Sequence, residues 1–229
     1  MNISCLPTGW INTYRENLIK DKKNAIKRGP FGSTVKKSFF VERGYKVYEQ
    51  KNAIYDDSDL GNYFIDQKKY DEFKDFNVQP GDFIVCSGTI GRIHKLNSNA
   101  LPGIINQALL KLSIDESIIV HNYFLFLFRS NEFQSKILKE TRGSAMQNIT
   151  SVKDLKKLEI LLPPLNEQFR IVDKIEELFT NLDAVIAELK NILQQVKRYR
   201  QSVLKAAFEG KLTGINNGEL KPTCVGDLS

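Results

Sequence analysis

Residue types able to carry out chemistry are present in this chain, but none stands in a pattern that predicts a catalytic centre. The two histidines, His94 and His121, have no acidic residue or cysteine at metal-ligand spacing, so we expect no metal site. The three cysteines, Cys5, Cys86 and Cys224, form neither a Cys-x-x-Cys pair nor a zinc pattern, which favours reduced thiols. Because Gly-x-Gly-x-x-Gly and Walker A loops are also absent, nothing indicates a nucleotide site.

Two short triplets keep one enzymatic alternative open. Glu49-Gln-Lys51 and Glu72-Phe-Lys74, the second with Asp66 upstream, resemble the Glu-x-Lys of metal-dependent nucleases. Such triplets arise often by chance in a chain that is 26% charged. A small nuclease therefore remains an alternative, and it predicts DNA cleavage with magnesium or manganese.

The basic charge of the chain is confined to its first part. Residues 1–157 hold 24 Lys and Arg against 17 Asp and Glu, whereas residues 158–229 hold 9 against 10. A basic domain joined to a neutral segment is typical of a polyanion-binding head on a protein-binding stem. Lysines and arginines in turn-rich segments can reach phosphates, and polar neighbours can read base edges. The candidate DNA-binding residues are Ser33, Thr34, Lys36, Lys37, Lys68, Lys69, Thr89, Arg92, Arg142, Ser144, Gln147 and Asn148.

A long helix is predicted after the proline pair Pro163-Pro164, which cannot continue a helix. Asn166 is a good N-cap, and the next glycine, Gly210, is typical of a helix terminator. The intervening 44 residues would make a helix roughly 66 Å long.

Apolar residues repeat along this helix in steps of three and four, which indicates a heptad pattern and coiled-coil packing. The predicted interface positions are Val172, Ile175, Phe179, Leu182, Ile186, Leu189, Leu193, Val196, Arg200 and Val203. Arg200 interrupts the apolar series and should help to fix the register, because a polar core residue tolerates few alignments. A third apolar position, at Leu178, Val185, Ile192 and Tyr199, widens the stripe beyond a two-stranded seam.

The first part of the chain is predicted to mix strands and helices, so the fold class is α+β. The expected strands are Tyr45–Tyr48, Phe83–Cys86, Ala108–Leu112 and Ile118–Val120, and the expected helices are Asn122–Phe128, Glu132–Lys139 and Val152–Lys157. Since no apolar run approaches the roughly 18 residues of a membrane span and no signal peptide is visible, we expect a cytoplasmic protein.

Several segments, taken in order, resemble the specificity (S) subunits of type I restriction-modification enzymes. They are Leu6-Pro-x-Gly-Trp10, Gly29-Pro-Phe-Gly-Ser33, Val78-Gln-Pro-Gly-Asp82, Ser87-Gly-Thr-Ile-Gly91, Arg142-Gly-Ser-Ala-Met-Gln147, Leu162-Pro-Pro-Leu-x-Glu-Gln168 and Ala206-Ala-Phe-Glu-Gly-Lys-Leu212. Each segment is weak evidence by itself, but their order and spacing make the resemblance specific.

The resemblance implies a DNA target recognition domain at residues 1–157, a conserved spacer and dimerisation helix at 158–212 and a flexible tail at 213–229. It implies a non-catalytic subunit that reads half of a bipartite site in double-stranded DNA. Its partners would be methyltransferase (M) and restriction (R) subunits, which would hold S-adenosylmethionine, ATP and magnesium, so that this chain binds no cofactor. Full members have two recognition domains and two helices, so this chain is expected to be either a natural half-subunit or the N-terminal half of a longer chain. The apolar stripe is expected to pair two copies, with the antiparallel orientation that the resemblance implies. Alternatively, the stripe folds back on the recognition domain or awaits the helix of a missing C-terminal half. A coiled-coil adaptor without nucleic-acid binding remains a second alternative.

Overall fold

The computed structural model describes residues 7–31, 34–86, 92–139 and 157–212. The chain divides into two compact units, residues 1–173 and 174–229. The first unit therefore extends past residue 157, the predicted end of the recognition domain, and takes in the start of the long helix.

Within the described residues, the strands of the first unit form three sheets. A four-stranded antiparallel sheet has the order β2-β10-β7-β8, made of Ile26–Arg28, Leu109–Leu112, Phe83–Cys86 and Ile93–Lys95. A five-stranded sheet has the order β3-β5-β4-β9-β6, made of Phe40–Val41, Phe64–Ile65, Tyr45–Tyr48, Gly103–Ile105 and Asn77–Val78. The pair β1-β11 consists of Ile11–Tyr14 and Glu159–Leu162.

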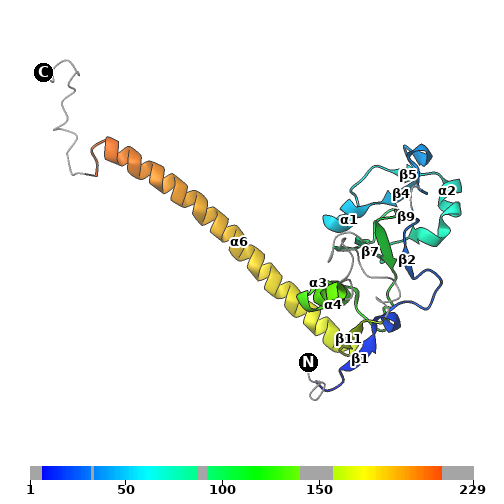
Figure 1. Cartoon of the computed structure of the whole chain (residues 1–229). Coiled ribbons are helices and arrows are strands. Elements are labelled where there is room, and N and C mark those ends of the chain that lie inside the picture. The colour runs from blue at the N-terminus through cyan, green and yellow to red at the C-terminus, as the bar shows by residue number, and fades with distance from the viewer. Residues whose placement is uncertain (1–6, 32–33, 87–91, 140–156, 213–229) are drawn as a thin grey trace. The chain divides into compact units, whose positions relative to one another are not determined.

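The α-helices are short except for the last. They are α1 (Gln50–Ile54), α2 (Gln67–Glu72), α3 (His121–Arg129), α4 (Asn131–Lys139) and α6 (Leu165–Phe208). In the view of Figure 1, α2, β4 and β5 lie at one end of the first unit and β1 and β11 at the other. The predicted α+β class is confirmed, as are the strands at residues 45–48 and 83–86 and the long helix.

Three apolar clusters hold the first unit together. The largest packs α3 and α4 against the four-stranded sheet, through side chains such as Phe83, Phe124 and Phe128, and includes Val172 of α6. The two smaller clusters lie under β4 and β9. Rings within the largest cluster meet at tilted or edge-on angles, for example Phe83 and Phe124 at 5.1 Å, which is the arrangement that aromatic quadrupoles prefer.

Two of the predicted local features are wrong. Residues Ile118–Val120 form a turn before α3 instead of a strand, because the N–H groups of Ile118 and Ile119 both donate to Asp115 O. The side chain of Gln168 bonds to the other groups, Ile118 O and Val120 N. The N-cap of α6 is Pro164, whose carbonyl accepts from Gln168 N, so Asn166 lies inside the first turn. The predicted helix Val152–Lys157 lies almost wholly outside the described residues.

Gly210 ends α6 as predicted. It has φ +73°, and its N–H donates to Ala207 O while Lys211 N donates to Ala206 O. This pair of bonds is a Schellman motif, in which the left-handed residue satisfies carbonyls of the last turn.

Most of the motifs that carry the family resemblance prove to be structural. In Val78-Gln-Pro-Gly-Asp82, Asp82 N donates to Gln79 O across a turn in which Gly81 has φ +88°. Proline followed by a left-handed glycine is the type II signature. Gly29 approaches Asn106 so closely that an added Cβ would lie 1.9 Å from its carbonyl oxygen. Gly9 packs on Pro164, beside the pairing of β1 with β11. The motif that begins at Leu6 and the motif that begins at Leu162 therefore lie next to each other, although they come from opposite ends of the unit's sequence.

Candidate nucleic-acid interface

The structure brings two of the predicted lysine pairs together. Strand β3 pairs with β5, with Phe40 opposite Ile65, so the 3-10 turn Lys37–Phe39 before β3 lies beside helix α2 after β5. Lys36 and Lys37 therefore share one region of the surface with Lys68 and Lys69. Lys69 Nζ bonds to Glu72 at 2.6 Å and lies 4.2 Å from the centre of the Phe39 ring.

Aromatic side chains are interleaved with these lysines. Tyr45 and Tyr70 stack at 3.7 Å with an interplanar angle of 10°, and Phe40 stacks on Tyr63 at 4.5 Å. Lys51 Nζ lies 5.6 Å from the centre of the Tyr63 ring. The lysines of this surface suit nucleic acid, because phosphates attract the cations, and the stacked rings give the lysines and their neighbours a packed support.

We call this surface the lysine–aromatic face. It consists of Lys36, Lys37, Phe39, Phe40, Tyr45, Lys51, Tyr63, Gln67, Lys68, Lys69 and Tyr70. Four of its lysines, Lys36, Lys37, Lys68 and Lys69, are among the predicted DNA-binding residues, whereas Lys51, the aromatic residues and Gln67 are not. The sequence signal that was available is a lysine pair followed within one or two residues by an aromatic residue, at 36–40 and at 68–70.

Gln67 is exposed, yet both ends of its amide are bonded. Tyr45 Oη donates to Gln67 Oε1 at 2.5 Å, and Gln67 Nε2 donates to Asp71 Oδ1 at 2.9 Å. Since a carboxylate only accepts, the atom facing Asp71 must be the amide nitrogen, which fixes the orientation of the amide. Helix α2 begins at Gln67 because Asp66 caps it, accepting from Lys69 N at 2.7 Å.

Arg92 lies apart from the lysine–aromatic face. It leads into β8 and lines an open pocket of about 520 Å³ with Asp56, Arg129 and Gln134. Arg129 Nη2 donates to Asp56 Oδ2 at 2.8 Å, and His94 Nδ1 bonds to Asp56 Oδ1 at 2.7 Å. Burial pushes the pKa of Asp56 upward, but hydrogen bonds and charges from His94 and Arg129 outweigh burial and hold the pKa below its ordinary value.

Ser58 completes the connectivity of a Ser-His-Asp triad, since Ser58 Oγ lies 2.7 Å from His94 Nε2. A nucleophile must reach its substrate, however, and Ser58 is only 2% exposed. This arrangement therefore fixes the loop after α1 to β8 and α3. It also shows that His94 has an acidic partner, from 38 residues away in sequence, which spacing alone did not reveal.

The remaining predicted DNA-binding residues are less informative. Thr34 Oγ1 donates to Phe31 O and closes a turn. Ser33, Thr89, Arg142, Ser144, Gln147 and Asn148 lie outside the described residues. Phe31 follows the buried Pro30 in the chain and is 84% exposed.

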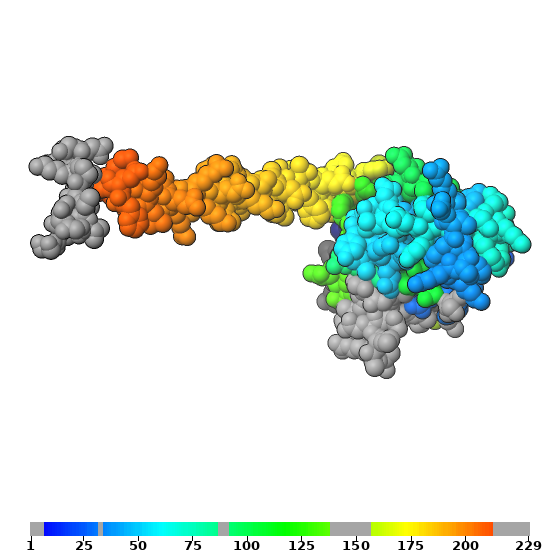
Figure 2. Space-filling model, turned by 90° about the horizontal axis from the view of Figure 1, so that it is seen from above, coloured from blue at the N-terminus to red at the C-terminus, as the bar shows by residue number. Residues whose placement is uncertain are grey.

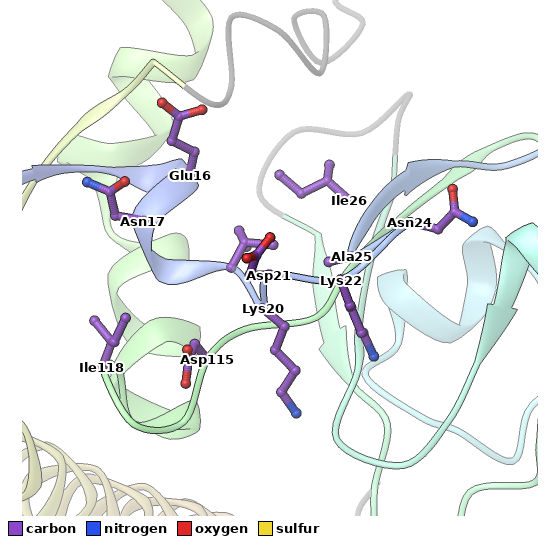
Figure 3. Close-up of a pocket in the computed structure, with 11 residues that line it drawn as sticks. Glu16, Asn17, Lys20, Asp21, Lys22, Asn24, Ala25, Ile26, Asp115 and Ile118 are labelled. Carbon is purple, nitrogen blue, oxygen red and sulfur yellow. The ribbon is translucent and has the colours of Figure 1, made fainter.

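A second open pocket lies between the segment 16–26 and the turn at Asp115 (Figure 3). Its charged side chains, among them Glu16, Lys20 and Asp115, point in different directions and do not converge on one ligand position.

In the parts of the chain that the structure describes, no group of three or more His, Cys, Asp or Glu side chains is placed to hold a metal ion. No helix among those same residues is long and apolar enough to cross a membrane.

The predicted interface of α6 is exposed over most of its length. Phe179, Leu182, Leu189 and Leu193 are each more than half exposed, and this part of α6 is a single helix in Figure 2, coloured yellow to orange. Val172 differs, because it is buried in the core of the first unit and does not offer its side chain to a second helix. The available stripe therefore begins near Ile175.

Comparison with known proteins decides the family. The profile of the type I restriction modification DNA specificity domain matches residues 32–198. The chain belongs to this family.

Curated S subunits are similar to this chain over 91% of its length in one case and 45% in another. The specificity subunit of the type I restriction enzyme EcoBI from Escherichia coli is 27% identical over 214 residues, which cover 91% of the chain and 43% of that subunit. The StySPI specificity subunit from Salmonella potsdam is 33% identical over 104 residues, which cover 45% of the chain and 22% of that subunit. The chain thus spans less than half the length of these relatives.

Solved structures share the fold. The HsdS subunit from Thermoanaerobacter tengcongensis superposes with a TM-score of 0.61 at 20% identity, covering 92% of the chain and 48% of that subunit. A chain from a study of type I R-M complex assembly and conformational transition superposes with a TM-score of 0.63 at 21% identity, with the same coverage. The S-subunit fold is therefore common to these chains.

Proposed function

We propose that this chain reads one half of a bipartite DNA target and docks the M and R subunits of a type I restriction-modification complex. The family match over residues 32–198 carries this proposal. The lysine–aromatic face supports it with a surface whose chemistry suits DNA, at one end of the first unit. Catalysis and the binding of S-adenosylmethionine, ATP and magnesium are assigned to the partner subunits, so the chain alone transfers no methyl group and cuts no DNA.

We infer that two copies pair through α6, because its exposed apolar stripe needs a cover. Each large apolar side chain that becomes buried contributes roughly 1.5–3 kcal/mol. The charges of α6 favour an antiparallel pair. Residues 165–188 contain six acidic and two basic side chains, whereas residues 189–208 contain five basic side chains and no acidic one. A parallel pair would place like charges opposite each other, and an antiparallel pair places the acidic half of each helix against the basic half of its partner.

This pairing also fits the expected reading of a divided target. Two identical heads related by a two-fold axis would read an inverted repeat with a fixed gap. A 44-residue helix is about 66 Å long, which is close to two turns of duplex at about 34–36 Å each. Arg200 lies in the basic half, so its guanidinium would meet the acidic half of the partner helix.

The proposal is tested by purifying the chain with candidate M subunits and mapping methylated sites in treated genomic DNA. We expect methylation at an interrupted inverted repeat, and only when M is present. Methylation that does not depend on this chain would contradict the proposal. Cleavage by the pure chain with magnesium or manganese would establish the nuclease alternative, and an M complex that assembles without binding DNA would establish the adaptor alternative.

A further inference from the structure

We propose that Gln67 reads an adenine in the DNA target, with Tyr45 and Asp71 as the residues that position its amide. This inference rests on the proposed function and names a base-reading residue within it. The first observation that supports it is that the side chain of Gln67 is exposed to solvent and yet is held in one position by hydrogen bonds. A glutamine on a surface normally loses up to about 2 kcal/mol of rotamer freedom when it is immobilised. Here the bonds to Tyr45 and Asp71 hold the amide before any ligand arrives.

The bonds that remain to Gln67 match one base edge. Oε1 accepts from Tyr45 and keeps one lone pair, and Nε2 donates to Asp71 and keeps one N–H. An adenine offers an N6 donor and an N7 acceptor side by side in the major groove, and a glutamine amide pairs with both. The remaining lone pair of Gln67 Oε1 can accept from adenine N6, and the remaining N–H of Nε2 can donate to adenine N7.

The supports of this amide are rigid. Tyr45 belongs to β4, which pairs with β5 and β9 in the five-stranded sheet. The Tyr45 ring stacks on Tyr70, one turn of α2 after Gln67, at 3.7 Å. Burial first, and then the nearby Tyr45 and Asp71, raises the pKa of Tyr70 above its ordinary value.

The charges around Gln67 are compatible with DNA. Lys68 is adjacent and exposed, and the segment with Lys36 and Lys37 lies alongside. Three carboxylates are also present on α2, and each is bonded within the helix. Asp66 bonds to Lys69 N, Asp71 bonds to Gln67 Nε2, and Glu72 bonds to Lys69 Nζ. Lys68, together with Lys36 and Lys37 on the neighbouring segment, can bind phosphates beside a base that the amide reads.

The experiment selects bound fragments from a randomised DNA library with the complex of this chain and its M subunits, and sequences them. With the wild-type chain we expect at least one position enriched in adenine. Gln67→Ala should lower the preference for adenine at one such position by about 10- to 100-fold, the discrimination expected of a bidentate contact. Gln67→Glu should shift that position toward cytosine, whose N4 amine donates to a carboxylate.

Two further variants separate reading from folding. Tyr45→Phe keeps the ring stacked on Tyr70 and removes only the hydroxyl, so it should reduce discrimination at the same position while the melting temperature changes little. Lys68→Ala should weaken binding to all sequences alike. If Gln67→Ala and Tyr45→Phe leave every position of the target unchanged, the inference is wrong although the proposed function stands. If the wild-type complex selects no sequence, the proposed function fails.

Discussion

The side chain of Gln168 accepts a hydrogen bond at 2.8 Å from the backbone N–H of Val120, which lies 48 residues earlier in the chain. The amide nitrogen of Gln168 donates to Ile118 O at 3.0 Å and to Pro163 O at 2.9 Å. Gln168 is completely buried, and its side chain bonds to the backbone of the buried Pro163, the half-buried Val120 and Ile118, which is 37% exposed. One side chain thereby joins the start of α6 to the turn before α3.

Replacement of Gln168 by Ala should therefore destabilise the first unit. A buried backbone group left unpaired costs about 1–3 kcal/mol, so we expect a loss of about that size in the free energy of unfolding, chiefly from the buried carbonyl of Pro163. Urea denaturation followed by circular dichroism measures this loss. Asn166→Ala is the matched control, because Asn166 lies in the same helical turn and is exposed. Equal stability of the two variants would show that the bonds of Gln168 contribute nothing net.

The same contact shows where prediction from sequence succeeds and fails. The long helix was predictable because its apolar period persists over five heptads, and a glycine with positive φ marks its end. Residues 118–120 were assigned to a strand because two of the three are isoleucine and the third is valine, all β-branched. Instead, the N–H groups of Ile118 and Ile119 close a turn on Asp115 O, and the remaining groups bond to the distant side chain of Gln168. The contact with Gln168 is tertiary and leaves no local pattern.

The candidate interface was predictable to a similar extent. The lysines could be chosen as DNA-binding candidates from the sequence, because their charge and their place in turn-rich segments are visible without a structure. The pairing of β3 with β5, which unites Lys37 with Lys68, depends on a register that no local signal fixes. Gln67 could not be singled out, because its importance comes from Tyr45 on another strand.

Acid should weaken the contact that Asp56 makes with His94 and Arg129. The pKa of Asp56 lies below its unfolded value, so the stability it contributes is present above about pH 4 and is lost as pH falls through the lowered pKa. In Asp56→Asn, the free energy of unfolding should fall less steeply as the pH is lowered below about 4. Arg129→Gln should move the decline toward higher pH, because a neutral amide stabilises the carboxylate less. Urea titrations between pH 2.5 and 7 would detect both changes. An acid limb that is unchanged in Asp56→Asn would contradict this account.

Lys36 and Lys37 should bind phosphates without reading sequence. If each neutralises one phosphate, the double variant Lys36→Ala/Lys37→Ala should reduce the slope of log K against log salt by about 1.8, and weaken binding to all sequences alike. Fluorescence anisotropy across a salt series measures the slope. Lys136→Ala/Arg170→Ala removes the same charge from surface ion pairs with Glu132 and Glu167 and should leave the slope unchanged. Equal slopes in the two double variants would remove these lysines from the interface.

The self-association of α6 can be abolished without unfolding the first unit. Ile186 and Leu189 are 40% and 59% exposed, so charges placed there do not disturb the core of this chain, but they would enter the seam between two copies. Ile186→Glu/Leu189→Glu should therefore convert a dimer to a monomer of 26.2 kDa in sedimentation equilibrium, with the near-ultraviolet circular dichroism of the first unit unchanged. Asn191→Glu/Gln194→Glu adds the same charge outside the stripe and should remain dimeric. A wild-type mass of 26 kDa across micromolar concentrations would exclude the dimer. A double variant that stays dimeric would place the contact elsewhere, and the charge asymmetry of α6 would then need another partner.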